Sequence, residues 1–217
     1  MYKGNDTYIS SNTTIERRVY GDMRFNPNET AILDENKNVT ITINLNDGAD
    51  LMDINKTKLT ITVFWTVNNQ TQNRTVSDYR LNGQNITFAV NEEFESCYVD
   101  IKYDNLTAKT DIKVNTEITA SDAQYSDKDV KNITAAIVTG NGYKINITKD
   151  NIQVLNNGKA LNIDVNNSVI TIKDDLKYGV YNLTVKYLGT YTFLASEKNV
   201  TLTVYGINAT SPVEVNS

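Results

Sequence analysis

Apolar and polar residues alternate along most of this chain, and Thr, Val, Ile and Tyr supply many of these positions. An alternation of period two predicts strands with one buried face and one solvated face. The 3.6-residue period of an amphipathic helix is hard to find. We therefore expect an all-β protein. The clearest strands are expected at residues 39–45, 58–67, 85–90, 98–103, 110–114, 133–138, 169–173, 181–187 and 200–205.

Turn signals separate these segments. Four dipeptides combine Asx with Gly, and such pairs tolerate the positive φ of tight hairpins: Asp47-Gly48, Asn82-Gly83, Asn141-Gly142 and Asn157-Gly158. Short strands joined by tight turns predict antiparallel pairing and a sandwich of two sheets.

A weak internal repeat divides the chain. Residues 99–103 align with 183–187, and residues 112–114 align with 202–204. The offset grows from 84 to 90 because the last hairpin of the second unit is longer. We expect two β-sandwich units, each long enough for its own core. Their expected bounds are 1–115, with an irregular lead-in over about 1–30, and 116–210; residues 211–217 then begin a following unit.

Composition excludes several functional classes. The net charge is −5 and the 21 Lys and Arg residues are scattered, so we expect no nucleic-acid partner. No apolar stretch is long enough to span a membrane, and Met1–Asp6 lacks the apolar core of a signal peptide. Because the chain contains no His and only Cys97, neither a His-based catalytic mechanism nor a zinc site is available. We expect a non-enzyme without a cofactor, and Cys97 as a buried apolar residue.

Three further features raise questions of binding. Asp122, Asp127 and Asp129 are candidate ligands for Ca²⁺, although Asp is also a common turn residue. The loop of Asp47, Asp50 and Asp53 offers a second, weaker set. Trp65 alternates with Val63 and Ile61, which predicts a core Trp on a central strand. Tyr98 is expected to face outward, and exposed aromatic rings can stack on sugars.

Acceptor triplets for N-glycosylation occur fifteen times, about three times the number that composition predicts. Strand alternation also places Asn two residues from Thr, but it works equally in both directions. The reversed triplet occurs only five times, so the excess is directional, as for a motif read by an enzyme. We therefore expect a glycosylated exterior protein. The sites selected are Asn38, Asn85, Asn105, Asn132, Asn146, Asn182 and Asn199.

The most specific sequence motif lies in the second unit. Residues 176–189 read Leu-Lys-Tyr-Gly-Val-Tyr-Asn-Leu-Thr-Val-Lys-Tyr-Leu-Gly, and residues 200–204 read Val-Thr-Leu-Thr-Val. This segment resembles the immunoglobulin-like repeats of large prokaryotic surface proteins, most closely the adhesin-like proteins of methanogenic archaea. Tyr181 follows Gly179 closely enough to turn its hydroxyl back to the preceding loop, as in a tyrosine corner. Cys97 occupies the corresponding position of the first unit.

The resemblance implies a stalk or spacer segment at the cell surface, outside the cell, with a possible part in adhesion. Its partners would be neighbouring repeats of the same chain and a glycan or protein on another cell. Export would require a signal outside this sequence, which favours a segment of a longer protein. Three alternatives stay open: a carbohydrate-binding module, an accessory domain of a secreted enzyme, and an intracellular binding domain.

Overall fold

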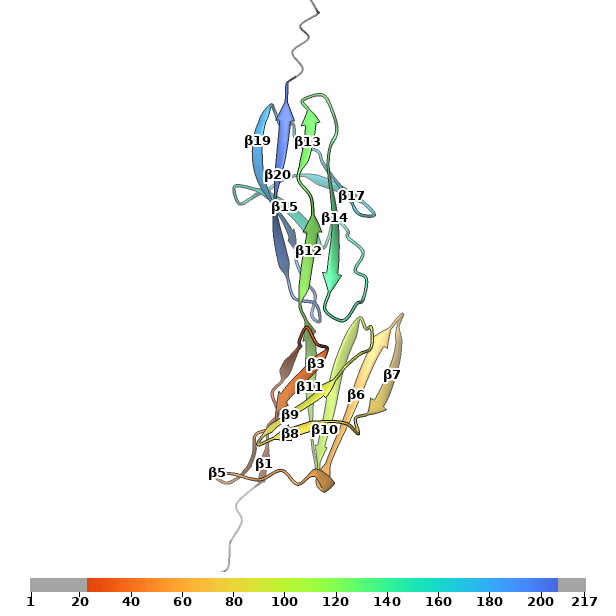
Figure 1. Cartoon of the computed structure of the whole chain (residues 1–217), viewed down its shortest axis with the longest axis vertical. Helices are drawn as coiled ribbons and strands as arrows, with labels where there is room; N and C mark the ends of the chain where they lie inside the picture. Colours follow the sequence, from red (N-terminus) through yellow and green to blue (C-terminus); the bar gives the residue numbers. More distant parts are fainter. Residues whose placement is uncertain (1–22, 207–217) are drawn as a thin grey trace, which may run out of the picture.

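Two tandem immunoglobulin-like β-sandwiches, arranged end to end, make up the computed structural model of the chain, which describes residues 23–206 (Figure 1). The expected fold class is confirmed. The predictions for residues 1–22 and 207–217, including most of the irregular lead-in and the start of a following unit, lie outside the described residues.

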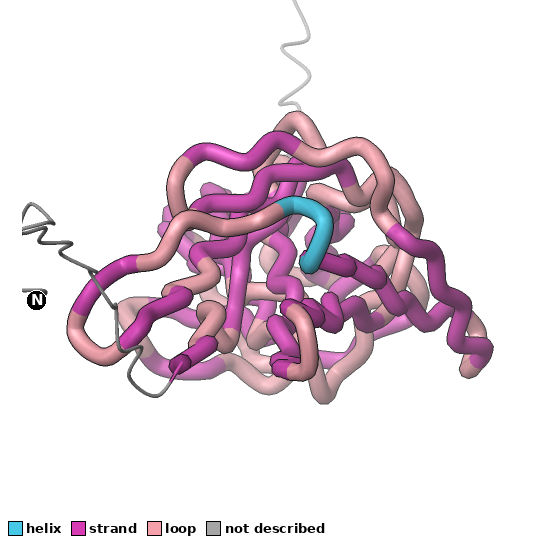
Figure 2. The backbone as a smooth tube through the Cα atoms, turned by 90° about the horizontal axis from the view of Figure 1, so that it is seen from below, coloured by secondary structure: helices cyan, strands magenta, loops and turns pink. Residues whose placement is uncertain are grey.

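The first sandwich contains eleven strands and one short 3₁₀ turn. They are β1 (Met23–Phe25), β2 (Thr30–Leu33), β3 (Asn38–Thr42), β4 (Leu45–Asp47), β5 (Asp50–Leu51), η1 (Lys56–Lys58), β6 (Leu59–Val67), β7 (Gln70–Thr75), β8 (Arg80–Asn82), β9 (Asn85–Ala89), β10 (Ser96–Tyr103) and β11 (Leu106–Val114). The turn η1 lies at the lower end of Figure 1 and at the front of Figure 2. No helix among residues 23–206 has the length and apolar character needed to cross a membrane.

Hydrogen bonding links these strands in the order β7-β6-β10-β11-β2-β3-β9-β8. Strands β2 and β3 meet through the single pair Leu33 and Val39, so the sheet folds there into two layers. Strand β2 runs parallel to β11, whereas the other neighbours in this sheet are antiparallel. A small sheet, β1-β4-β5, is added beside them. The expected strand at 39–45 is divided, because Asn44 adopts a φ of 52° and ends the extended run.

The second sandwich contains nine strands. They are β12 (Thr116–Ala120), β13 (Ala123–Ser126), β14 (Lys131–Thr139), β15 (Ile152–Asn156), β16 (Lys159–Ala160), β17 (Ile163–Asn166), β18 (Val169–Ile172), β19 (Gly179–Tyr187) and β20 (Ser196–Tyr205). Two sheets form, in the orders β12-β14-β18-β17 and β13-β20-β19-β15-β16, and β13 runs parallel to β20.

The strand register confirms the internal repeat. Tyr98 pairs with Asp111 between β10 and β11, and Asn182 pairs with Thr201 between β19 and β20. These two pairs differ by the offsets of 84 and 90 residues found in the sequence. Strand β10 is therefore equivalent to β19, and β11 is equivalent to β20.

Alternation along the strands fills each core. On β10, the residues Cys97, Val99, Ile101 and Tyr103 are buried, whereas the residues between them face outward. Burying one such apolar side chain contributes about 1.5–3 kcal/mol, which favours this register over a slip by one residue. The buried residues of both sandwiches form one connected cluster.

Candidate functional site at the junction of the sandwiches

Backbone pairing joins the two sandwiches. Only Asn115 separates the end of β11 from the start of β12. The loop 188–195, between β19 and β20, reaches back to the first sandwich: Val114 N donates to Thr192 O at 2.9 Å, and Leu194 N donates to Val114 O at 2.9 Å. Val114 and Phe193 thereby form an isolated parallel bridge. The second sandwich thus adds a short piece of backbone to an edge of the first.

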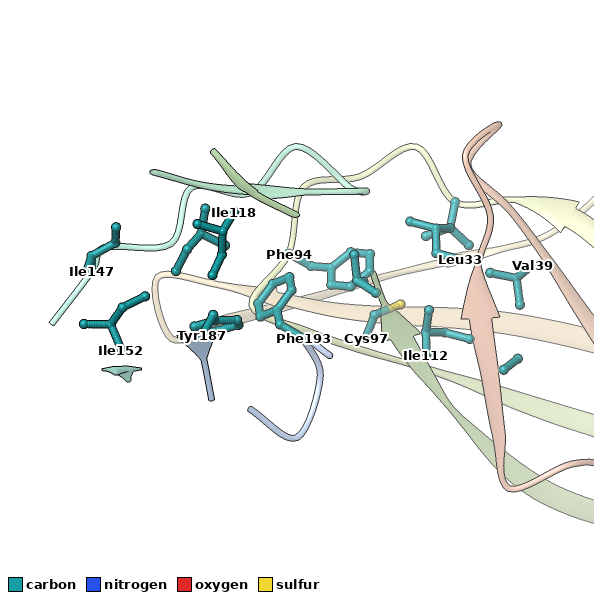
Figure 3. Close-up of a cluster of buried hydrophobic side chains, with 14 of the residues drawn as sticks. Leu33, Val39, Phe94, Cys97, Ile112, Ile118, Ile147, Ile152, Tyr187 and Phe193 are labelled. Atoms are coloured by element: carbon teal, nitrogen blue, oxygen red, sulfur yellow. The ribbon is translucent and has the colours of Figure 1, made fainter. Parts of the chain in front are cut away.

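Aromatic side chains close the space beneath this bridge. Phe94, from the first sandwich, is fully buried, and Phe193 from the second is 4% exposed. In Figure 3 these two rings lie between Cys97 on one side and Tyr187 on the other, in a continuous row of buried side chains. The Tyr143 ring stacks on Phe193 with centroids 5.7 Å apart. The apolar core therefore continues from one sandwich into the next.

Polar groups in the junction are paired with one another. The buried Asn141 amide donates through Nδ2 to Phe94 O at 2.9 Å, and its Oδ1 accepts from Tyr143 N at 3.2 Å. The Tyr143 hydroxyl donates to Glu95 Oε1 at 2.9 Å. Burial and the hydrogen bond to Glu95 raise the pKa of Tyr143, so its hydroxyl stays protonated as a donor. Gly140 N donates to Asn115 O at 3.0 Å.

An exposed polar cluster covers the outer side of the junction. The Tyr191 hydroxyl donates to the Asp111 carboxylate, and Lys113 Nζ lies 3.2 Å from the Tyr191 ring centroid. Lys109 pairs with Asp111 at 2.8 Å. Partial burial acts to raise the pKa of Asp111, but hydrogen bonds from Lys109 and Tyr191 hold that pKa below its usual value. Because the cluster is largely solvated, it orients the loop more than it stabilises it.

Sequence reasoning missed this site. Asn141-Gly142 was expected only as a hairpin turn. It is a tight turn, because Gly142 N donates to Thr139 O at 3.1 Å. It also makes the contact that covers Phe94 in the first sandwich. The longer last hairpin of the second unit was the available signal, because its extra residues carry Tyr191 and Phe193.

The acceptor Asn residues lie on the surface. Of the twelve in residues 23–206, ten are exposed and two, Asn38 and Asn132, are half-buried. The selected sites Asn85, Asn105, Asn146, Asn182 and Asn199 are all exposed. The middle residue of the triplet is buried at six of the seven selected sites, as strand alternation requires. Glycans at these positions would not disturb the core.

Two acceptor triplets face each other on β19 and β20. Asn182 pairs with Thr201, and Thr184 pairs with Asn199. Thr184 Oγ1 donates to Asn199 Oδ1 at 2.9 Å. This bond uses the amide oxygen rather than the nitrogen to which a glycan would be attached.

The three calcium candidates take part in hydrogen bonds within the protein. Asp122 Oδ1 accepts from Thr201 N at 2.7 Å, and Asp129 Oδ2 accepts from Ser126 N at 3.0 Å. The third, Asp127, receives a hydrogen bond at its backbone oxygen from Lys131 Nζ at 2.7 Å. Within residues 23–206, no three His, Cys, Asp or Glu residues are grouped as a metal site. A calcium site stays a prediction with no geometric support from these positions.

The expected tyrosine corner is confirmed. The Tyr181 hydroxyl donates to Lys177 O at 2.7 Å, which ties the start of β19 to the loop before it. In the first sandwich the corresponding Cys97 is 5% exposed, as expected of an apolar filler. Desolvation, followed by the nearby Glu92 charge, raises the pKa of this thiol to about 12.

The outward aromatic residues do not form an open platform. Tyr98 stacks on Phe64 at 4.8 Å with an interplanar angle of 6°, and Lys109 Nζ lies 4.4 Å from the Tyr98 centroid. Strand β10 lies between β6 and β11, so Phe64 and Lys109 flank Tyr98 from opposite sides. Both faces of the Tyr98 ring are therefore occupied. Trp65 is half-buried against the core, rather than enclosed within it.

Comparison with known proteins identifies no family for this chain. No family model and no curated protein matches it. Among solved structures, the chain is similar to a Dscam structure that concerns isoform specificity. The TM-score is 0.41, and the match has 10% identity and covers 85% of this chain and 46% of the Dscam chain. The chain is also similar to the I9–I11 tandem of titin, with TM-score 0.28 and 10% identity over 85% of this chain and 66% of the other. The chain spans about half the length of the Dscam structures, and identities this low concern the fold alone.

Proposed function

We propose that this chain is a structural and adhesive repeat segment of a glycosylated cell-surface protein, in which it acts as a stalk or spacer. Its units divide at residues 115 and 116, and it performs no catalysis. The observation that carries the proposal is the buried junction, where Phe94 and Phe193 join the two cores.

A spacer must resist bending at its joints. Domains in one chain move relative to each other unless the interface between them is large and apolar. Here the linker is one residue long, the loop 188–195 pairs with Val114, and aromatic rings fill the space beneath. Bending would separate Phe94 from Phe193 and break the hydrogen bond from Asn141 to Phe94 O, which costs about 0.5–1.5 kcal/mol net because water can replace the amide.

The directional excess of acceptor triplets supports the glycosylated exterior setting. Glycans on the outer strand faces would also hinder pairing of exposed edges with other chains. The resemblance of residues 176–204 to archaeal adhesin-like repeats supports the same setting. Neighbouring repeats, and a ligand on another cell, are the partners that this role requires.

Small-angle X-ray scattering on Phe193→Ala, with Phe88→Ala as the matched control, tests the spacer role. Both Phe side chains are nearly fully buried, at 4% and 3% exposure, but only Phe193 lies in the junction. We expect the parent chain and Phe88→Ala to scatter as one extended particle, and Phe193→Ala to give a broad range of end-to-end distances. A parent chain that already bends freely would contradict the spacer role.

Glycopeptide mapping of the protein from its source organism tests the setting. Enzymatic removal of an N-glycan converts its Asn to Asp, which marks each occupied site by mass. We expect several of the seven selected sites to carry sugar. If all of them are bare in the source organism, the glycosylated exterior setting is wrong.

A further inference from the structure

Large apolar side chains are exposed at the far pole, which we define as Val130, Tyr178, Val180 and Tyr205. Their exposed fractions are 62%, 78%, 68% and 51%, respectively. Val180 lies near the start of β19 and Tyr205 at the end of β20, at the upper end of Figure 1, and Tyr178 directly precedes β19. Large apolar side chains exposed together at one end of a domain mark an interaction surface.

The strand register brings the two Tyr residues together. Val180 pairs with Thr203, and Gly179 pairs with Val204. Tyr178 directly precedes Gly179 and Tyr205 directly follows Val204, so the two Tyr residues flank the end of this ladder. The far pole therefore carries two exposed Tyr residues at the same end of β19 and β20 as Val180.

The equivalent positions of the first sandwich are covered. The offset of 84 residues relates Tyr178 to Phe94, and the offset of 90 relates Tyr205 to Asn115. Phe94 is fully buried in the junction. Phe94 O accepts from the Asn141 side chain, and Asn115 O accepts from Gly140 N. Both positions are thus capped by one turn of the following sandwich.

We propose that the far pole is a docking surface for the leading end of a further sandwich of the same plan as residues 116–206. Its Asn-Gly turn would donate to the carbonyl of residue 178, as the Asn141 side chain does to Phe94 O, and an aromatic residue of its long last hairpin would pack on Tyr178. Tyr205 O differs from Asn115 O, because it already accepts from Asp127 N at 2.9 Å. This inference rests on the proposed spacer function and assigns its repeat-to-repeat contact. Tyr178 takes the part that Phe94 takes in the existing junction.

The first sandwich of a second copy, residues 23–114, does not offer the same contact. The last hairpin of the first sandwich turns at Asp104-Asn105, because Tyr103 pairs with Leu106. That two-residue turn carries no aromatic side chain and has no length to reach a neighbour. The leading end of residues 23–114 therefore lacks the loop that makes the existing contact.

An extended chain tests the proposal. Residues 1–205 are followed directly by a second copy of 116–206, so that Tyr205-Thr116 reproduces the spacing of Asn115-Thr116. Small-angle scattering is compared between the extended and the parent chain. We expect one extended particle lengthened by a third sandwich, without broadening of its distance distribution.

The variant is Tyr178→Ala in the first of the two copies of residues 116–205, where Tyr178 faces the new joint. The control is Tyr79→Ala, which lies between β7 and β8 of the first sandwich. We expect Tyr178→Ala to broaden the distance distribution and Tyr79→Ala to leave it unchanged. In the parent chain, Tyr178→Ala should leave the thermal midpoint unchanged, since this side chain is mostly exposed.

Two results overturn the proposal. The new joint bends freely although the parent junction stays stiff, or the joint is stiff and Tyr178→Ala has no effect on it. Either result leaves the spacer function standing. A parent chain that is itself flexible contradicts the spacer function instead, so the two failures are distinguishable.

Discussion

Tyr181 and Cys97 occupy the same position of the two repeats in different ways. Tyr181 keeps its ring near the surface and ties its hydroxyl to Lys177 O at 2.7 Å. Cys97 turns a small apolar group inward, opposite Trp65 on the neighbouring strand. The first repeat therefore gives up one hydrogen bond at this position and gains a buried thiol.

That thiol makes stability depend on pH. The pKa of Cys97 rises from 9.0 to about 12 on folding, so the folded protein retains the proton between these values and the unfolded chain loses it. Stability from this group is complete below pH 9 and falls as pH rises towards 12. At pH 10 we expect a loss of about 1.4 kcal/mol relative to pH 8. Chemical denaturation of the parent chain and Cys97→Ala at both pH values measures the difference.

Other residues that titrate above pH 9 affect the parent chain and Cys97→Ala alike. The measured quantity is therefore the difference between the two proteins in how their free energy of unfolding changes with pH. Equal pH dependence in the parent and in Cys97→Ala would show that the thiol is not desolvated. Folded protein should also fail to react with a thiol reagent at pH 8, whereas denatured protein should react at once.

The sequence identifies residues whose environment is local. The Tyr181 hydrogen bond spans four residues, and the outward Asn of a strand triplet follows from alternation alone. Asn141 was predictable only as a turn residue, because its partner Phe94 lies 47 residues away in another sandwich. No local pattern indicates such a contact.

At the scale of elements, the loop 188–195 depends on Gly189. This residue has a φ of 79°, and a Cβ there would lie 2.8 Å from Ala195 N and 2.9 Å from Phe193 O. Both neighbours are backbone atoms and have little freedom to move away. The loop can carry Phe193 into the junction only because this position lacks a side chain.

Gly189→Ala should therefore destabilise more than Gly158→Ala. Gly158 has the same φ of 79°, but a Cβ there meets nothing within 4 Å. We expect both variants to lose about 1–2 kcal/mol of unfolding free energy because of the backbone conformation. Gly189→Ala should lose more than about 1 kcal/mol in addition, because of the steric clash. Urea denaturation measures both. Equal losses would mean that the loop relaxes around the added methyl group without cost.

Strands with an alternating pattern were predictable, and strands without one were not. The nine expected strands are present, with β3 shorter than expected. Strand β7 reads Gln-Thr-Gln-Asn-Arg-Thr and is almost entirely exposed, so it carries no apolar period. It exists because β6 offers six pairing partners along its edge. A polar edge strand of this kind also discourages pairing with other chains.

The whole molecule should unfold as one unit. Its buried residues form a single cluster across both sandwiches, so loss of one sandwich exposes apolar surface of the other. We expect one calorimetric transition whose van't Hoff and calorimetric enthalpies agree. Phe193→Ala removes the central ring, costs about 3–5 kcal/mol and should split the transition in two.

Phe88→Ala is the contrasting variant, since it should lower the midpoint by a similar loss of core packing yet keep one transition. Two transitions in the parent chain would show that the shared core does not couple the sandwiches. The sequence divides the chain at residue 115 but contains no periodic signal for this coupling, which arises from side chains of four separate loops and strand ends.

The two parallel strand pairs determine how the molecule resists a pulling force. Strand β2 pairs with β11 over Thr30–Leu33, and β13 pairs with β20 over Ala123–Ser126. In the first sandwich the chain enters near β2 and leaves from the far end of β11. In the second it enters through β12, which pairs with β14 and leads into β13, and leaves from the far end of β20. Tension between the ends therefore slides the two strands past each other, and their cross-strand hydrogen bonds are loaded together rather than opened one after another. Each repeat therefore has its own pair of parallel strands that resists the force by shear, and the two pairs are loaded in series.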